Sequence, residues 1–292
     1  MVRVVVALFA GIVGISFAAL FVRWALPAPP VVTAFYRMLF ATALLAAWLV
    51  AAREALPAWP STRLALAAGL CFGTDLALWH TAIVRTSLAN ATLLVNTTPI
   101  FVGLYAWSAL GEAPGWRFAA AAALALAGAA LLLGSSSATA GAETRSGDLL
   151  SVAAALFYSG YLLLMKAARR DGHTLPVLAI ASGGAAAILG VYSAALGDRF
   201  AGFPTHSWVA MIGAAAVAQV GGVLGIVWAL RWARASFASV ALLAQPVGTS
   251  LLAWWLLGER IGARQALGGA AVLAAIALAS GRALDVDRER PS

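Results

Sequence analysis

Hydrophobic residues along the chain form long runs, each broken by Pro, Gly or charged residues. A helix needs about 20 consecutive apolar residues to cross the hydrocarbon core of a bilayer. The runs are too long for strands, and their breaks carry residues that commonly end helices. The pattern therefore predicts ten membrane-spanning helices, over residues 4–25, 31–51, 63–83, 87–109, 116–134, 148–167, 175–196, 207–230, 235–257 and 263–280.

Composition supports a lipid environment and excludes a sizeable soluble domain. Of the 292 residues, 63% are hydrophobic and 10% are charged, whereas soluble domains carry about 25% charged residues. Ten spans of about 20 residues each leave roughly 92 residues for the termini and the connections. The connections are then short, and the function has to lie inside the helix bundle.

Basic residues indicate how the helices are oriented. The net charge is +8, which in a soluble protein would suggest nucleic acid, but here Lys and Arg are expected to gather on cytoplasmic loops. With a cytoplasmic N-terminus, twelve basic residues fall inside, including the cluster at 166–170, and six fall outside. We therefore predict a multi-pass protein of a bacterial-type inner membrane with both termini in the cytoplasm and no nucleic-acid partner.

The two halves of the chain repeat one another. Pro99, Trp107 and the pair Gly111-Glu112 each recur 147 residues later, beginning with Pro246, and Trp79 recurs as Trp228 after 149 residues. Upstream, Ser16 and Ser159 match more weakly, 143 residues apart. Aligned Pro, Trp and Gly-Glu residues are unexpected by chance in a chain rich in Ala and Leu.

Each repeat contains five predicted helices, so the second enters the membrane from the opposite side. Inverted repeats of this kind build many secondary transporters, which bind substrate near the midplane between the repeats and work by alternating access. The predicted organisation is a first repeat over residues 1–134, an outer linker over 135–147, a second repeat over 148–281 and a cytoplasmic tail over 282–292.

With two five-helix repeats, each closing with a Pro-containing helix and a Gly-Glu turn, the chain resembles the drug/metabolite transporter superfamily, EamA-type. Polar and aromatic residues in its third and fourth spans look most like the YddG-type amino-acid exporters within it. The resemblance implies an all-α integral membrane protein of the inner membrane. It also implies export of small amino acids, neutral or aromatic ones in particular, or of related metabolites.

Three ionisable residues within the predicted spans are candidates for function. Asp75 is the deepest acidic residue, where an ionised carboxylate costs about 2.5–3.5 kcal/mol; it either binds substrate or protons beside Trp79, or packs as a neutral, hydrogen-bonded carboxyl. His80 either contacts a substrate, titrates with Asp75 or is satisfied at the helix end. Arg37 either snorkels to the interface, pairs with Asp75 or holds a substrate carboxylate.

Two prolines and several polar or aromatic neighbours complete the candidate pathway. Pro99 and Pro246 each remove a backbone donor and kink their helices, acting as hinges or only shaping the packing. The carbonyl that loses its donor is tolerated in a membrane where another protein group or a water-filled cavity supplies a hydrogen bond. Candidate pathway residues beside them and on other spans, which line a path or merely pack, are Asn96, Thr97, Gln245, Tyr36, Trp79, Tyr158 and Tyr161.

Sequence motifs of several other protein classes are absent. No serine-hydrolase, zincin or P-loop pattern occurs, so we expect neither an enzyme nor a cofactor or metal, and transport driven by gradients. The expected partners are a small-molecule substrate and the lipid bilayer, with protons as a further candidate; monomer and homodimer both stay open. The alternative functions are a proton-coupled multidrug or metabolite exporter using Asp75 and, less favoured, an intramembrane enzyme or a channel.

Overall fold

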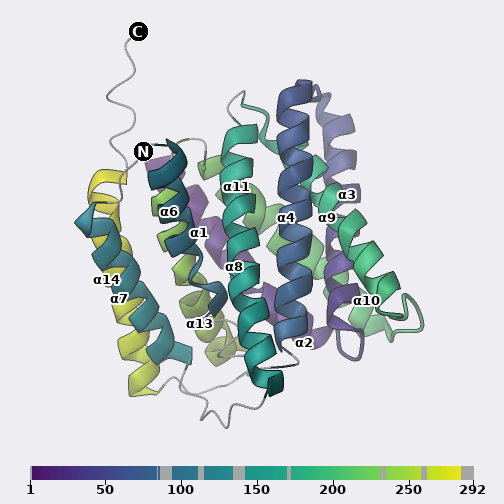
Figure 1. The fold of residues 1–292 in the computed structure, drawn as a ribbon. Coiled ribbons are helices and arrows are strands. Elements are labelled where there is room, and N and C mark those ends of the chain that lie inside the picture. The colour runs from purple at the N-terminus through teal and green to yellow at the C-terminus, as the bar shows by residue number, and fades with distance from the viewer. Residues whose placement is uncertain are drawn as a thin grey trace.

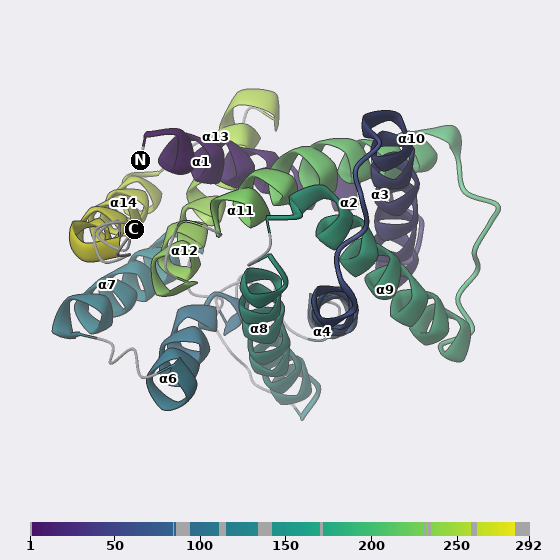
Figure 2. The ribbon, with the colours of Figure 1, turned by 90° about the horizontal axis from the view of Figure 1, so that it is seen from above.

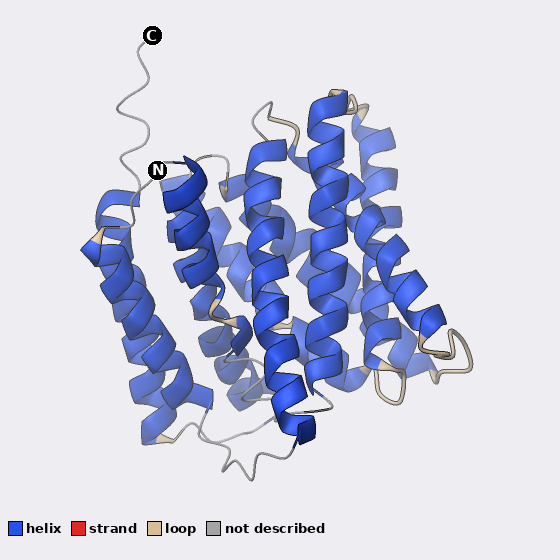
Figure 3. Cartoon of the chain, viewed as in Figure 1, coloured by secondary structure: helices blue, strands red, loops and turns tan. Residues whose placement is uncertain are grey.

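The computed structural model describes residues 2–83, 85, 94–110, 115–133, 142–169, 172–230, 232, 235–257 and 262–283. These residues form helices joined by short turns, and none of them forms a strand (Figure 3). The helices stand roughly side by side as one bundle (Figure 1). The predicted all-α class is confirmed.

The helices follow the predicted order of spans. The first half contains α1 (Val2–Ser16), α2 (Ala18–Trp24), α3 (Pro30–Ala52), α4 (Trp59–Ile83), α6 (Thr98–Leu110) and α7 (Trp116–Leu133). The second half contains α8 (Ala142–Ala168), α9 (Thr174–Ala195), α10 (Thr205–Gly213), η1 (Ala214–Val223), α11 (Leu224–Ala229), α12 (Ala235–Ala241), η2 (Leu242–Ala244), α13 (Gln245–Leu257) and α14 (Ala263–Ala283). The π-helix η1 joins α10 to α11 within the eighth span, and the 3-10 turn η2 joins α12 to α13 within the ninth.

Seven helical stretches among the described residues are long and apolar enough to cross a bilayer. They are Arg3–Trp24, Pro30–Ala52, Trp59–Ala82, Thr144–Ala168, Thr174–Ala195, Thr205–Ala229 and Phe237–Leu256. Shorter apolar helices, Trp116–Gly128 and Ala266–Ala275, occupy the predicted fifth and tenth spans. The predicted fourth span begins among residues outside the described ranges, and α6 covers its later part.

One helix begins earlier than its predicted span. Helix α8 begins at Ala142, so the end of the proposed 135–147 linker is helical. The prediction placed the start of the span at 148, directly after Gly147. Ala, Glu and Arg are nonetheless good helix formers, and they extend the helix by more than a turn before its apolar part. The Gly-Glu turns of both repeats lie outside the described residues.

Helices of the two halves pack against one another in a reciprocal way. Helix α4 of the first half packs on α8 and α9 of the second, while α1 packs on η1 and α11, and α7 packs on α14. These neighbours also lie side by side when the bundle is seen from above (Figure 2). The start of α1 and the end of α14 lie at the same side of the bundle (Figure 1). The core is therefore an interface between two halves of opposite orientation.

Glycine allows the close approach of α1 and η1. A Cβ atom on Gly222 of η1 would lie 2.8 Å from the backbone nitrogen of Ile15, and one on Gly14 would lie 2.6 Å from Gly222 Cα. Small residues let helix backbones approach closely within a membrane, where lipid supplies no hydrophobic drive between helices. The contact between α1 and η1 therefore depends on having no side chain at these positions.

Candidate functional site between the two halves

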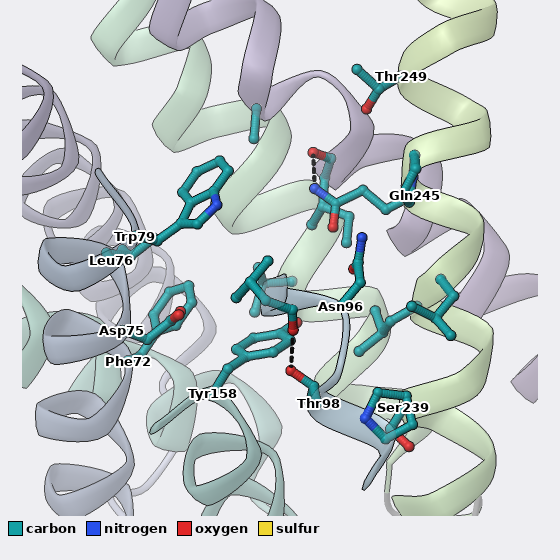
Figure 4. Close-up of a pocket in the computed structure, with 18 of the residues that line it drawn as sticks. Phe72, Asp75, Leu76, Trp79, Asn96, Thr98, Tyr158, Ser239, Gln245 and Thr249 are labelled. Atoms are coloured by element: carbon teal, nitrogen blue, oxygen red, sulfur yellow. Dashed lines mark hydrogen bonds between the residues drawn. The ribbon is translucent and has the colours of Figure 1, made fainter. Parts of the chain in front are cut away.

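A cavity of about 230 Å³ lies between the two halves of the bundle (Figure 4). It is lined by α1, α3 and α4, by the residues around the start of α6, and by α8, the end of η1 and the α12–η2–α13 segment. The predicted site residues that line it are Arg37, Asp75, Trp79, Asn96, Pro99, Tyr158, Gln245 and Pro246. The structure therefore gathers candidates from spans that are far apart in the sequence.

The α4 wall carries the acidic group of the site. Asp75 and Trp79 project from one side of α4 (Figure 4), as expected for residues four positions apart. Asp75 is 5% exposed, and no hydrogen bond or ion pair joins it to another residue in the part of the chain that the structure describes. The structure therefore shows no hydrogen-bonding partner for this carboxyl group among the described residues.

The α3 wall carries the basic group. Arg37 lines the cavity and is only 8% exposed, so it does not snorkel to the interface. Its Nη2 donates a 2.9 Å hydrogen bond to Oε1 of Gln219, while its Nε has no partner among the described residues. No ion pair joins it to Asp75 within the described residues. A guanidinium has five N–H donors, and the Nη2 bond to Gln219 uses one of them.

Aromatic rings form much of the remaining wall. Phe72, Trp79 and Tyr158 line the cavity, and the buried indole Nε1 of Trp79 has no partner among the described residues. Tyr161 lies behind this layer, stacked on Phe72 with ring centroids 4.5 Å apart. A donor and three ring surfaces therefore face the same space as the two charged groups, an arrangement that favours an amphipathic ligand.

The two prolines interrupt their helices beside the cavity. Pro99 follows a turn at Asn96 and Thr97, and Pro246 follows η2. Proline removes the donor for the carbonyl four residues earlier, and each freed carbonyl has another partner. The Thr98 hydroxyl donates to the Val95 carbonyl at 2.7 Å. The backbone N–H of Gln245 donates to the Leu242 carbonyl.

Polar side chains beside these breaks face the cavity. The amide Nδ2 of Asn96 is buried without a partner among the described residues, and Gln245 donates to the Ile15 carbonyl at 3.4 Å. Both line the cavity across from Asp75 and Trp79 (Figure 4). These amides therefore add polar groups to the wall of the cavity that lies opposite α4.

Four predicted pathway residues do not line this cavity. The Tyr36 hydroxyl donates to the Phe200 carbonyl at 2.6 Å, and the Thr97 hydroxyl donates to Leu94. The His80 ring nitrogen Nδ1 lies 2.7 Å from the Pro30 carbonyl, and Tyr161 is the fourth. Tyr36 directly precedes the lining residue Arg37, and His80 directly follows the lining residue Trp79. Because consecutive helical residues point about 100° apart, only one residue of each pair lines the cavity.

Gln219 is a site residue that the sequence analysis missed. It is the one polar residue among the ten of η1, and it is fully buried beside Arg37. An isolated amide in an apolar span is a signal that the sequence does contain, because a buried polar group is costly without a partner. Its partner lies 182 residues away in the chain, so the sequence could not identify it.

A second, more open hollow of about 780 Å³ lies toward the side where α1 begins. The cavity-facing α4 residues Phe72, Asp75, Leu76 and Trp79 have counterparts 149 residues later, and all four counterparts line this hollow. They are Gly221, Leu224, Gly225 and Trp228. Equivalent helix faces of the two halves thus border two different spaces.

The Arg169 side chain forms hydrogen bonds with the last turn of α11 near this hollow. The predicted basic loop places it toward the cytoplasm, but its side chain is fully buried. Its guanidinium donates to the carbonyls of Val227 and Trp228 and to the Thr174 hydroxyl. Cations are stabilised at helix C-termini, which explains why this member of the basic cluster turns inward.

Comparison with known proteins adds a family match. The model of the EamA-like transporter family matches residues 2–134 and 145–281, one match in each half. A solved structure titled "Crystal structure of protein" superposes with a TM-score of 0.82 at 20% sequence identity, covering 96% of this chain and 98% of that chain. At this identity the likeness shows a common fold. Among proteins with curated descriptions, none matches the chain.

Proposed function

Because the chain belongs to the EamA-like transporter family, we propose that this multi-pass membrane transporter exports small amino acids or related metabolites. The chain is a transporter of the drug/metabolite type, whose ligands are a small-molecule substrate and the surrounding lipid. The proposal adds the substrate class, export across a bacterial-type inner membrane, and transport without catalysis.

One observation carries the substrate class: the same cavity is lined by the Asp75 carboxylate and the Arg37 guanidinium, which do not pair with each other. Opposite charges are favourable partners for the ammonium and carboxylate groups of a zwitterion. A guanidinium fork is well suited to a carboxylate, and the unpartnered carboxylate of Asp75 suits an ammonium group. A free amino acid satisfies both groups at once.

The remaining surface and the size of the cavity narrow the class further. Phe72, Trp79 and Tyr158 offer ring faces against which an apolar or aromatic side chain packs. The volume of about 230 Å³ lies below the range of roughly 300–1,000 Å³ typical of pockets for drug-sized ligands. Both features favour neutral and aromatic amino acids over larger drugs.

Inverted halves support an alternating-access mechanism. In this mechanism the two faces of the bundle open in turn, and the Pro99 and Pro246 breaks are natural hinges. The equivalent faces of α4 and of the η1–α11 segment border two different spaces, the cavity between the halves and the hollow toward the side where α1 begins. We propose that these spaces exchange roles when the halves tilt, with both chain termini in the cytoplasm.

A proton-coupled exporter is the second candidate function. It is favoured by Asp75, a buried carboxylate without a partner among the described residues. Membrane-embedded carboxylates commonly act as proton carriers in transporters. Under this alternative, flux depends on a pH gradient and the substrates include larger organic cations.

Transport by purified protein in liposomes tests the proposal. We expect flux of several neutral or aromatic amino acids, and competition between them, with at least a tenfold loss in Asp75→Asn. Asp198→Asn is the matched control, because Asp198 lies in the connection between α9 and α10, away from the cavity. Organic-cation flux without any amino-acid flux across a broad panel would reject the substrate class, and flux driven only by a pH gradient would favour the alternative.

A further inference from the structure

We infer that Gln219 is a positioning residue that aims the Arg37 guanidinium at the carboxylate of the substrate. The inference rests on the proposed function and extends it to a residue outside the cavity lining. Gln219 does not line the cavity, so its effect on a ligand has to pass through Arg37.

The geometry places Gln219 between two other polar side chains. Its Oε1 accepts the 2.9 Å hydrogen bond from Arg37 Nη2, and its Nε2 lies 3.5 Å from the Ser182 hydroxyl. Arginine can only donate, so the amide oxygen has to face Arg37 and the amide nitrogen has to face Ser182. The orientation of the side chain is therefore set by its two neighbours.

Three helices contribute to this chain of contacts. Arg37 lies on α3, Ser182 on α9 and Gln219 on η1, and α3 packs on both α9 and η1. All three side chains are nearly or fully buried. Hydrogen bonds at such sites are strong because the surroundings have a low dielectric constant, and the cost of leaving them unmade is correspondingly large.

The π-helical form of η1 is consistent with this role. The backbone hydrogen bonds of a π-helix join residues five positions apart in place of the usual four, and such segments are frequent at functional sites. Nine of its ten residues are Ala, Val or Gly. The single amide is therefore the only side chain of η1 able to hold a polar group of another helix.

The hydrogen bond occupies one edge of the guanidinium and leaves the rest free. Nη2 is held by Gln219, while Nε is buried without a partner among the described residues. Arg37 lines the cavity, so the fork is fixed on one side and available to a ligand on the other. Preorganisation of this kind lowers the entropic cost of binding.

A purely structural role for Gln219, as a partner that only satisfies a buried charge, makes a different prediction. If the role is purely structural, replacing Gln219 lowers the stability of the protein and weakens the binding of all ligands by the same factor. A positioning role affects ligands according to whether they carry a carboxylate. The comparison of L-phenylalanine with phenylalaninamide separates the two, because the amide keeps the ammonium group and the ring but lacks the anionic group.

The experiment measures the binding of both compounds to the purified full-length protein in detergent, together with its melting temperature. In Gln219→Leu we expect L-phenylalanine to bind roughly tenfold more weakly, with less than a twofold change for phenylalaninamide. Ser182→Ala should give a smaller change of the same kind. Ser193→Ala is the matched control, because Ser193 is buried on the same helix and its hydroxyl has no partner among the described residues.

Gln219→Glu keeps an acceptor facing Arg37 and serves as the second variant if Gln219→Leu does not fold. We expect it to retain the preference of the unmodified protein for the carboxylate compound more closely than Gln219→Leu. An unchanged preference in a folded Gln219→Leu, or equal weakening of both compounds, overturns the inference while leaving the proposed function intact. Failure of the unmodified protein to bind any amino acid overturns both.

Discussion

Ser16 and Ser159 occupy equivalent positions in the two halves, and each hydroxyl lies 3.3 Å from the carbonyl that precedes the proline break of the other half. Ser16 on α1 reaches Gln245, and Ser159 on α8 reaches Thr98. Each serine also donates to its own helix, at 2.8 Å and 2.7 Å. A hydroxyl has one proton, so in each half two acceptors compete for it.

This reciprocity predicts matched effects of Ser16→Ala and Ser159→Ala. Each change removes a contact between one half and the hinge of the other, worth about 1 kcal/mol or a factor of about 5 in a conformational equilibrium. We expect both variants to shift the transport rate in the same direction and by a similar factor. Flux in liposomes measures this effect.

Ser151→Ala is the control for that prediction. Ser151 is buried on α8, and the hydrogen bond described for its hydroxyl goes to the Gly147 carbonyl of its own helix. It therefore isolates the contribution of the bond between helices. An effect of Ser151→Ala as large as that of Ser159→Ala would show that the contact across the halves is irrelevant.

Arg37→Lys tests the geometry of the basic group separately from its charge. Lysine keeps the positive charge but lacks the planar fork, so it cannot bind a carboxylate through two parallel hydrogen bonds. We expect the KM for L-phenylalanine transport to rise roughly tenfold while the protein remains folded. Arg199→Lys, in the exposed connection before α10, should leave the KM unchanged. An unaltered KM in Arg37→Lys would argue against bidentate binding at this residue.

Gly222→Ala tests the close contact between α1 and η1. The added Cβ would meet the Ile15 backbone nitrogen at 2.8 Å, and backbone cannot move aside without shifting a helix. Overpacking of this kind costs about 1–3 kcal/mol, and we expect a lower melting temperature. Gly183→Ala is the control, since its Cβ would meet the nearest atom, Thr42 Cγ2, at an ordinary 3.5 Å. Equal melting temperatures for the two variants would contradict this packing.

Labelling of introduced cysteines tests the orientation in the membrane. In a Cys71→Ala background, Glu54→Cys and Arg199→Cys place thiols on exposed connections at opposite sides of the bundle. Positive residues predict that the side carrying Glu54 is cytoplasmic. An impermeant maleimide applied to intact cells should label the thiol at 199, and the one at 54 only after permeabilisation. The reverse pattern would invert the assigned topology.

The positions of the helices and the repeat were readable from the sequence alone. A chain in lipid has to satisfy its backbone hydrogen bonds within each span, so span length and apolar composition nearly determine the helices. Pro99 and Pro246 likewise mark breaks whatever the surroundings, because proline lacks a backbone donor. The start of α8 departed from the prediction because helix propensity carries the helix beyond its apolar part.

The tertiary structure alone decided which side chains meet. Arg37 and Tyr36 are neighbours in sequence, yet one lines the cavity and the other binds the Phe200 carbonyl, because their directions differ by about 100° on the helix. The rotation of each helix about its axis is set by packing against distant helices, as at Gly14 and Gly222. The sequence therefore determined where the helices lie along the chain, while packing determined the cavity and brought Gln219 to Arg37.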